Sequence, residues 1–316
     1  MDALAGLLEG PRARGALMIR ACFDPPWSVR VEDGAPLTVM LMVRGEGWVV
    51  PDDGERIRLT AGDLAIARGP APYTCADDPA TPPQALILPG GECAYPDGRL
   101  LNGSMDLGVR AWGDRLDGST VLLIGTYLMR GEISARLLDA LPPLLSLTSR
   151  EWPCPLTPLL MDEIARDEPG QEVVLDRMLD LLVIAALRAW FARPEAAAPA
   201  WYRAQADPVV GRVLRLVQDD PAHPWTVASL AATAGVSRAA LARRFTALVG
   251  EPPMTHLTGW RLALAADRLH ATEETIGAIA RQVGYGSAFA LSTAFKRMYG
   301  VSPQEYRARE ARPGAA

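Results

Sequence analysis

A short pattern that occurs twice between residues 225 and 306 constrains the fold of this chain more than any other feature. The first copy is WTVASLAATAGVSRAALARRF, residues 225–245, and the second is TIGAIARQVGYGSAFALSTAFKR, residues 275–297. Apolar, glycine, serine, leucine and phenylalanine positions coincide if the second copy gains one residue. The matching pairs are Leu230 and Ile279, Gly235 and Gly284, Ser237 and Ser287, Leu241 and Leu291, and Phe245 and Phe295.

This spacing is typical of a helix-turn-helix. The glycine supplies a sharp turn, and the serine that follows, Ser237 or Ser287, is the expected N-cap of the second helix. The leucine and phenylalanine, four residues apart, pack inward and leave the opposite face in water. Such a helix fits the DNA major groove, which is about 12 Å wide and displays distinguishable base edges. One copy would equally suit a helical bundle with glycine turns, but two copies favour DNA binding.

Residues 208–309 resemble the DNA-binding domain of the AraC/XylS family of transcription regulators. The resemblance is carried by GYGSAFALSTAFKRMYGVSPQEYR, residues 284–307, and by RLALAADRL, residues 261–269, which is similar to the family's connecting helix. It implies a regulator that binds double-stranded promoter DNA, and it leaves RNA polymerase open as a further partner. An enzyme is the competing class, and an adaptor protein that does not bind DNA is a third class.

The charge distribution agrees with DNA binding. The whole chain carries a formal charge of −5, but residues 208–310 hold 12 Arg or Lys against 8 Asp or Glu, so this part is +4 and the rest −9. Positive charge on the repeated region is what neutralisation of phosphates requires.

The outward positions of the two second helices are the predicted DNA contacts. They are Arg238, Ala239, Ala242 and Arg243 in the first copy, Ala288, Phe289, Ser292 and Thr293 in the second, and Lys296 and Arg297 as phosphate contacts. Arg243 is the predicted base contact, because its planar fork suits guanine O6 and N7. Thr293 stands where the family usually has Arg, and Phe289 is apolar. The second helix is therefore expected to read thymine methyls or DNA shape.

The N-terminal part is predicted to form β-strands, because short apolar segments alternate with turn residues from Gly15 to about Gly91. The run GEGWVV, an acidic turn and RLTAGDLAIARG resembles a cupin, and Gly45, Gly62 and Asp63 carry that resemblance. A short helix is expected over residues 1–10. Together the two resemblances predict an α+β multidomain protein. It has a cupin-like β-barrel with a helical dimerisation segment, residues 1–192, a linker, residues 193–207, and an all-α tandem helix-turn-helix domain, residues 208–310.

Catalysis and metal binding are not expected. All three histidines, His223, His256 and His270, lie in the helical half, and the positions where cupins place ligands hold Met40 or Leu41 and Pro72. No nucleophile elbow, HExxH or phosphate loop occurs, so no catalytic residue, metal or cofactor is assigned. A cupin enzyme that works without metal is the remote alternative.

Two inputs to the barrel are predicted. In the first, an unknown small molecule fills an apolar interior lined by Met40, Met42, Trp48 and Leu64. In the second, Cys22 senses oxidants, since it occupies the position of a reactive cysteine in similar oxidant-sensing regulators and lies near Arg20, whose guanidinium would lower the thiol pKa. A buried Cys22 that serves only as a small hydrophobe is the alternative. All four cysteines are expected to be reduced thiols.

Helices are expected over residues 156–166 and 171–191. The second is apolar over most of its circumference, so it needs a cover on two sides: the barrel, and a second subunit of a homodimer. A helix buried within one chain is the alternative. Its charged residues exclude a membrane span, and the N-terminus has no secretory pattern. The protein is therefore expected to be cytoplasmic, with no membrane partner.

Overall fold

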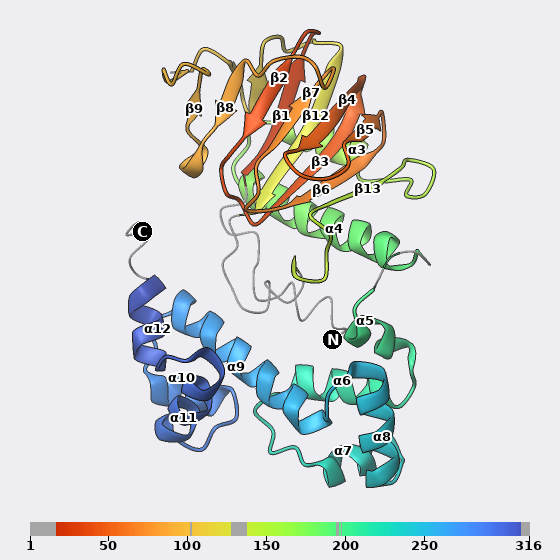
Figure 1. The fold of residues 1–316 in the computed structure, drawn as a ribbon, viewed down its shortest axis with the longest axis vertical. Coiled ribbons are helices and arrows are strands. Elements are labelled where there is room, and N and C mark those ends of the chain that lie inside the picture. Colours follow the sequence, from red (N-terminus) through yellow and green to blue (C-terminus); the bar gives the residue numbers. More distant parts are fainter. Residues whose placement is uncertain (1–16, 102, 128–137, 194–195, 197, 311–316) are drawn as a thin grey trace. The chain divides into compact units, whose positions relative to one another are not determined.

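The computed structural model describes residues 17–101, 103–127, 138–193, 196 and 198–310 (Figure 1). The described residues divide into two compact units, one within residues 17–127 and 141–196 and the other mainly within residues 198–310. The helix predicted over residues 1–10 lies outside the described residues.

The N-terminal unit contains two β-sheets that pack face to face. The larger sheet has the order β10-β11-β1-β12-β3-β6-β13 and the smaller β5-β4-β7-β2-β8-β9. The larger sheet consists of β1 (Leu17–Phe23), β3 (Leu37–Arg44), β6 (Leu64–Arg68), β10 (Asp106–Gly108), β11 (Ala111–Gly113), β12 (Thr120–Tyr127) and β13 (Leu144–Leu147). The smaller consists of β2 (Ser28–Val31), β4 (Glu46–Pro51), β5 (Ile57–Thr60), β7 (Tyr73–Ala76), β8 (Ala85–Ile87) and β9 (Cys93–Ala94), with the 3-10 turn η1 (Pro89–Gly91) before β9.

Successive side chains of each strand point to opposite faces of its sheet, and those on the two facing sides form the core between the sheets. Phe23 and Met40 of the larger sheet and Val49 and Cys75 of the smaller sheet belong to one buried apolar cluster. The region predicted to form β-strands, Gly15 to about Gly91, contains β1 to β8 among its described residues, and residues 24–27 lie between β1 and β2 without strand structure.

Two helices, α3 (Thr157–Ile164) and α4 (Gln171–Phe191), follow the sheets, and α4 has the predicted bounds. Leu179 of α4 packs against Gly125 of β12 so closely that a Cβ on Gly125 would collide with the leucine side chain. The inner face of α4 is thus buried against the outer face of the larger sheet. Its opposite face exposes Val173, Val174 and Leu181.

Asp63 ties the turn between β5 and β6 to the segment after β13. Its buried carboxylate accepts hydrogen bonds from the Thr60 amide and hydroxyl, both at 2.8 Å, and from the Ser149 amide at 2.7 Å. Burial alone would raise the pKa of Asp63, but these hydrogen bonds outweigh it and hold the pKa below its usual value. Asp63, one of the three residues that carry the cupin resemblance, is therefore a structural anchor of this unit.

The C-terminal unit is helical. Its elements are α5 (Ala200–Arg203), η2 (Ala204–Ala206), α6 (Val210–Asp219), α7 (Val227–Ala234), α8 (Arg238–Val249), α9 (Pro253–Ala271), α10 (Ile276–Gln282), α11 (Ala288–Tyr299) and α12 (Pro303–Glu310). One apolar core lies among α6, α7 and α8, and a second among α9, α10 and α11. The long helix α9 joins them, because Leu257 near its start belongs to the first core and Leu269 near its end to the second.

Part of the predicted linker is folded. Ala204 is buried in the first core, and Trp201 packs against Trp260 of α9. Residues 200–206 are apolar enough to pack on the helical unit. Their high alanine content is the reason that the sequence predicts a linker here.

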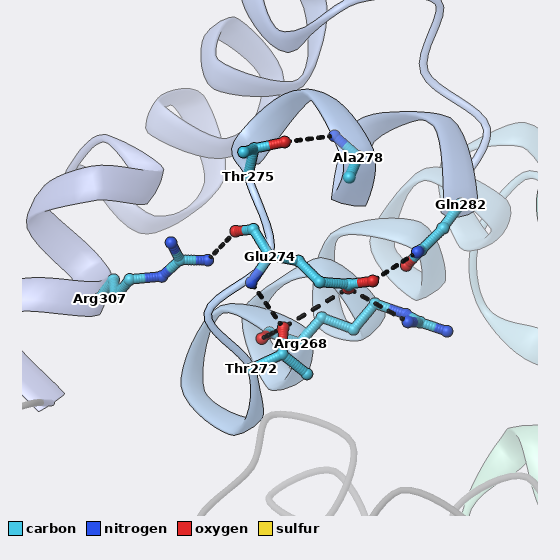
Figure 2. A network of polar contacts seen from close by, with 7 residues as sticks. All are labelled: Arg268, Thr272, Glu274, Thr275, Ala278, Gln282 and Arg307. Atoms are coloured by element: carbon cyan, nitrogen blue, oxygen red, sulfur yellow. Dashed lines mark hydrogen bonds and ion pairs between the residues drawn. The ribbon is translucent and has the colours of Figure 1, made fainter.

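A polar network around Glu274 fixes the start of α10 in the second half of this unit (Figure 2). Gln282 donates to the Glu274 carboxylate at 2.8 Å, Arg307 of α12 donates to the Glu274 carbonyl at 2.6 Å, and Arg268 of α9 lies 3.6 Å from the carboxylate. Thr275 then caps α10 by accepting from the Ala278 amide at 3.2 Å. Three helices are thus held together where α10 begins.

Candidate functional site

The two turns between paired helices have the same backbone design. Gly235 after α7 and Gly284 after α10 both adopt left-handed backbone angles, with φ of 73° and 85°. At each turn the residue after the glycine donates back into the preceding helix, Val236 to the Ala231 carbonyl at 3.0 Å and Tyr285 to the Ala280 carbonyl at 2.7 Å. Positive φ suits glycine, which has no Cβ to clash.

Serine caps the second helix of each pair, as predicted. Ser237 Oγ accepts from the Ala240 amide at 3.2 Å, and Ser287 Oγ accepts from the Ala290 amide at 3.1 Å. The additional residue of the second copy, Gly286, lies in the turn before the cap. The caps therefore set the register that relates α8 to α11, in which positions differ by 50 in number.

The inner faces of α8 and α11 are equivalent. Leu241 and Phe245 are buried in the first core, and Leu291 and Phe295 are buried in the second. The predicted DNA contacts lie on the remaining surface. Arg238, Ala239, Arg243, Phe289, Thr293, Lys296 and Arg297 are exposed, and Ala242, Ala288 and Ser292 are partly buried.

Neighbouring arginines on α8 differ in their surroundings. Arg244 forms an ion pair with Asp207, with its Nη2 and Nε 2.6 and 2.8 Å from the carboxylate. Asp207 also accepts from the amide of Val210 at 2.9 Å, and these bonds outweigh the effect of burial and lower the pKa of Asp207. No acidic side chain in the described part of the chain pairs with Arg243. Arg243 is thus available to a ligand, whereas Arg244 is engaged.

The outward face of α11 is less polar. Phe289 is 82% exposed. The Thr293 hydroxyl donates to the Phe289 carbonyl at 3.0 Å, so its hydrogen is already used within the helix. Lys296 and Arg297 follow one turn later and are exposed.

The histidines His256 and His223 contact neighbouring side chains. His256 is buried, with Nδ1 2.9 Å from a Glu251 carboxylate oxygen, and its ring packs edge-on to Phe245. His223 lies against Trp225, with ring centroids 4.2 Å apart. Among the residues that the structure describes, no three His, Cys, Asp or Glu side chains are grouped to hold a metal ion.

A cavity of about 440 Å³ lies between the two sheets of the N-terminal unit. Its walls are mostly apolar and aromatic, with a few polar side chains. The lining residues include Ile19, Ala21, Phe23, Trp27, Val29, Val31, Asp33, Thr38, Met40, Tyr73, Cys75, Ile87, Cys93, Trp112, Leu122, Ile124 and Thr126. Trp27 stacks on Phe23 at 4.8 Å between ring centroids, and Trp112 meets Phe23 edge-on.

Of the four residues predicted to line the barrel, only Met40 lines this cavity. Met42 is buried further along the same core, and Trp48 is half-buried beside Arg56, outside it. Leu64 is fully buried away from the cavity. These three residues do not line this cavity, because strand alternation decides which side chains reach it, and Val49, not Trp48, belongs to the core between the sheets.

The Cys22 thiol is fully buried on β1. Burial raises the pKa of Cys22, and the nearby Arg20 and Arg44 guanidinium groups lower it by less. The predicted direction of this shift was therefore wrong, because desolvation of a thiolate outweighs two partly solvated charges. Cys75 in the cavity wall is also buried, which raises its pKa to about 12.

In the described ranges, no helix combines the length and the apolar composition that a bilayer crossing demands.

Comparisons with known proteins agree with both units. A family model described as cupin matches residues 2–192, and one described as helix-turn-helix domain matches residues 230–309. A putative AraC-like transcription regulator of Streptomyces lividans is 34% identical over 318 residues, covering 97% of this chain and 98% of the relative. One of Streptomyces antibioticus is 33% identical over 316 residues, covering 97% and 98%.

Among solved structures, the DNA-binding domain of AdpA, the global transcriptional factor, in complex with a target DNA is 32% identical. That match covers 34% of this chain and 99% of that chain, with a TM-score of 0.32. The cupin match, the helix-turn-helix match and the full-length similarity to AraC-like regulators show that this chain belongs to the AraC family of DNA-binding transcription regulators and carries an N-terminal cupin domain.

Proposed function

We propose that α7–α8 and α10–α11 act as tandem helix-turn-helix motifs that place α8 and α11 in successive major-groove segments of a promoter. The observation that carries this proposal is the shared register of the two pairs. Each second helix is capped by a serine after a glycine turn, buries the same leucine and phenylalanine, and leaves the opposite face exposed. The exposed faces of α8 and α11 are alike, and the long helix α9 joins the two helix pairs. This arrangement suits binding to two neighbouring stretches of one duplex.

Within this proposal, α8 supplies the hydrogen-bonded base contact through Arg243. Its guanidinium has no acidic partner among the described residues, which supports this role, and the Asp207 ion pair keeps Arg244 from it. Arg238 would meet phosphate or a base edge, and Ala239 and Ala242 allow the helix to approach the groove closely. Lys296 and Arg297 of α11 would contact phosphates.

The test begins with the full-length protein and sheared genomic DNA. Bound fragments are sequenced to obtain a site, and affinities for that duplex are then measured by fluorescence anisotropy at several salt concentrations. Arg243→Ala should weaken binding by about 1–3 kcal/mol and relax preference at one base pair. Arg244→Ala is the matched control, and it should leave the sequence preference unchanged. Equal loss by Arg243→Ala on every sequence would instead make it a backbone contact, and salt-insensitive binding would contradict the proposal.

We propose a sensor and dimerisation domain over residues 1–192, a linker over residues 193–207 and a DNA-binding domain over residues 208–310, with residues 200–206 of the linker packed on the helical unit. The cupin match that ends at residue 192 supports the first boundary. We further propose a homodimer formed through the exposed apolar face of α4, which carries Val174 and Leu181. A dimer would present two DNA-binding domains to one promoter.

The cavity between the sheets is the proposed input, so that the two sheets act as one barrel around a small molecule. Its volume of about 440 Å³ is within the range of ligand sites. Asp33 is the sole charged side chain among the lining residues, which also include the hydroxyl-bearing side chains Thr38 and Tyr73. The fitting effector class is therefore an apolar, partly aromatic molecule that carries a hydrogen-bond donor.

Nile red, an uncharged apolar dye, probes the cavity without knowledge of the effector. Ile124→Trp should fill the void and abolish dye fluorescence enhancement, since Ile124 lines the cavity and is only partly buried. A melting temperature near the wild-type value shows that the fold is kept. Unchanged dye binding would remove the cavity from the proposal.

We infer that the cavity is a better supported input than Cys22, because the Cys22 thiol is buried and its pKa is raised. An oxidant-responsive regulator would need thiolate that oxidants can reach. In a reporter assay, Cys22→Ser should therefore leave the response intact. Loss of an oxidant response in this variant would reverse the ranking of the two inputs.

A further inference from the structure

Phe289 is the most exposed large apolar side chain in the described residues, at 82%. It lies in the first turn of α11, two residues after the Ser287 cap. Isolated apolar side chains on a surface are common, but this one lies on the same face as Thr293 and Lys296, at the spacing of helical turns. The ring therefore projects from the face that the proposed function assigns to DNA.

The register set by the caps shows how α11 differs from α8. Ala239 and Arg243 of α8 correspond to Phe289 and Thr293 of α11. Where α8 presents a small residue and an available guanidinium, α11 presents a ring and a threonine whose hydrogen is donated to the Phe289 carbonyl. The surface of α11 that faces the groove is thus formed largely by C–H groups.

Only one base offers an apolar partner to such a surface. In the major groove, thymine carries a C5 methyl group, whereas the other bases present donors and acceptors. We propose that Phe289 is a specificity-determining residue that recognises the methyl group of a thymine in the part of the site bound by α11. The inference rests on the proposed function. It assigns hydrogen-bonded readout to α8 and apolar readout to α11.

The test replaces each thymine of the selected duplex, one at a time, by deoxyuridine, which removes only the methyl group. The wild-type protein should lose about fourfold in affinity at one or two positions, as expected for the burial of one carbon group. In Phe289→Ala the same replacement should have no effect. Arg243→Ala is the matched control, and it should keep the sensitivity to uracil at those positions.

Several outcomes would overturn the inference. Specific binding that tolerates uracil at every position would refute it and leave the proposed function intact. Phe289→Ala that keeps normal affinity and uracil sensitivity, but loses transcription activation in a reporter assay, would make Phe289 a contact to RNA polymerase. Absence of salt-sensitive binding to any duplex would refute the proposed function and this inference with it. Since Phe289 is outside both cores, the variant is expected to fold.

Discussion

Replacement of Leu181 by serine tests the proposed dimer interface on α4. Leu181 is 50% exposed and shares its face of the helix with Val174, which is also exposed. Full burial of a leucine stabilises by about 1.5–3 kcal/mol, so covering the exposed half contributes about 1 kcal/mol. A twofold interface uses the residue twice. Leu181→Ser should therefore weaken dimerisation by about 2 kcal/mol, or roughly 30-fold in Kd.

The chain offers a matched control for this variant. Leu116 is also 50% exposed, but it lies in the segment between β11 and β12, not on α4. In sedimentation velocity over a concentration series, Leu181→Ser should remain monomeric up to a much higher protein concentration than the wild type. Leu116→Ser should dimerise at the same concentration as the wild type. Equal behaviour of the two variants, or a wild-type protein that is monomeric throughout, would refute this use of α4.

Three other substitutions test local features. Asp63→Asn should lower the free energy of unfolding of the N-terminal unit by about 2 kcal/mol at neutral pH, because buried donors lose a charged acceptor. The pKa of Asp63 is lower in the folded protein than in the unfolded chain. Its carboxylate therefore stabilises the fold at pH values above the unfolded pKa, and this stabilisation is lost as the pH falls through the folded pKa. In denaturant titrations, the free energies of unfolding of the wild type and of Asp63→Asn should thus become equal in acid. A difference that stays constant with pH would contradict this role of Asp63. Ser237→Ala and Ser287→Ala should each cost about 1 kcal/mol. Hydrogen exchange should accelerate in α8 for the first and in α11 for the second, and unchanged exchange would show that the caps are dispensable.

The helical half was largely predictable from sequence because its signals are local. Glycine turns and serine caps act within a few residues, so Gly235 and Ser237 align with Gly284 and Ser287 on sequence spacing alone. The bounds of α4 followed for the same reason, since its apolar residues recur at the helical period.

The sheet half was predictable only in part. The hairpin of β4 and β5 joins strands that are neighbours in the chain, with turn residues between them. In contrast, β7 and β13 are four residues long and pair with β2 and β6, which lie far away in the chain. The cavity depends on which side chains of two sheets meet, so Trp48 could not be distinguished from Val49 without the register. The burial of Cys22 likewise depends on packing that its sequence neighbours do not reveal.

The central claim is that α8 and α11 enter successive groove segments of one duplex. It is tested most directly by measuring the affinity of Arg243→Ala and Phe289→Ala for every single-base-pair change across the selected site. The account predicts that the base pairs at which each variant loses discrimination form two separate clusters, about one helical turn of 10–10.5 base pairs apart. Two variants that lose discrimination at the same base pairs, or at none, would contradict it.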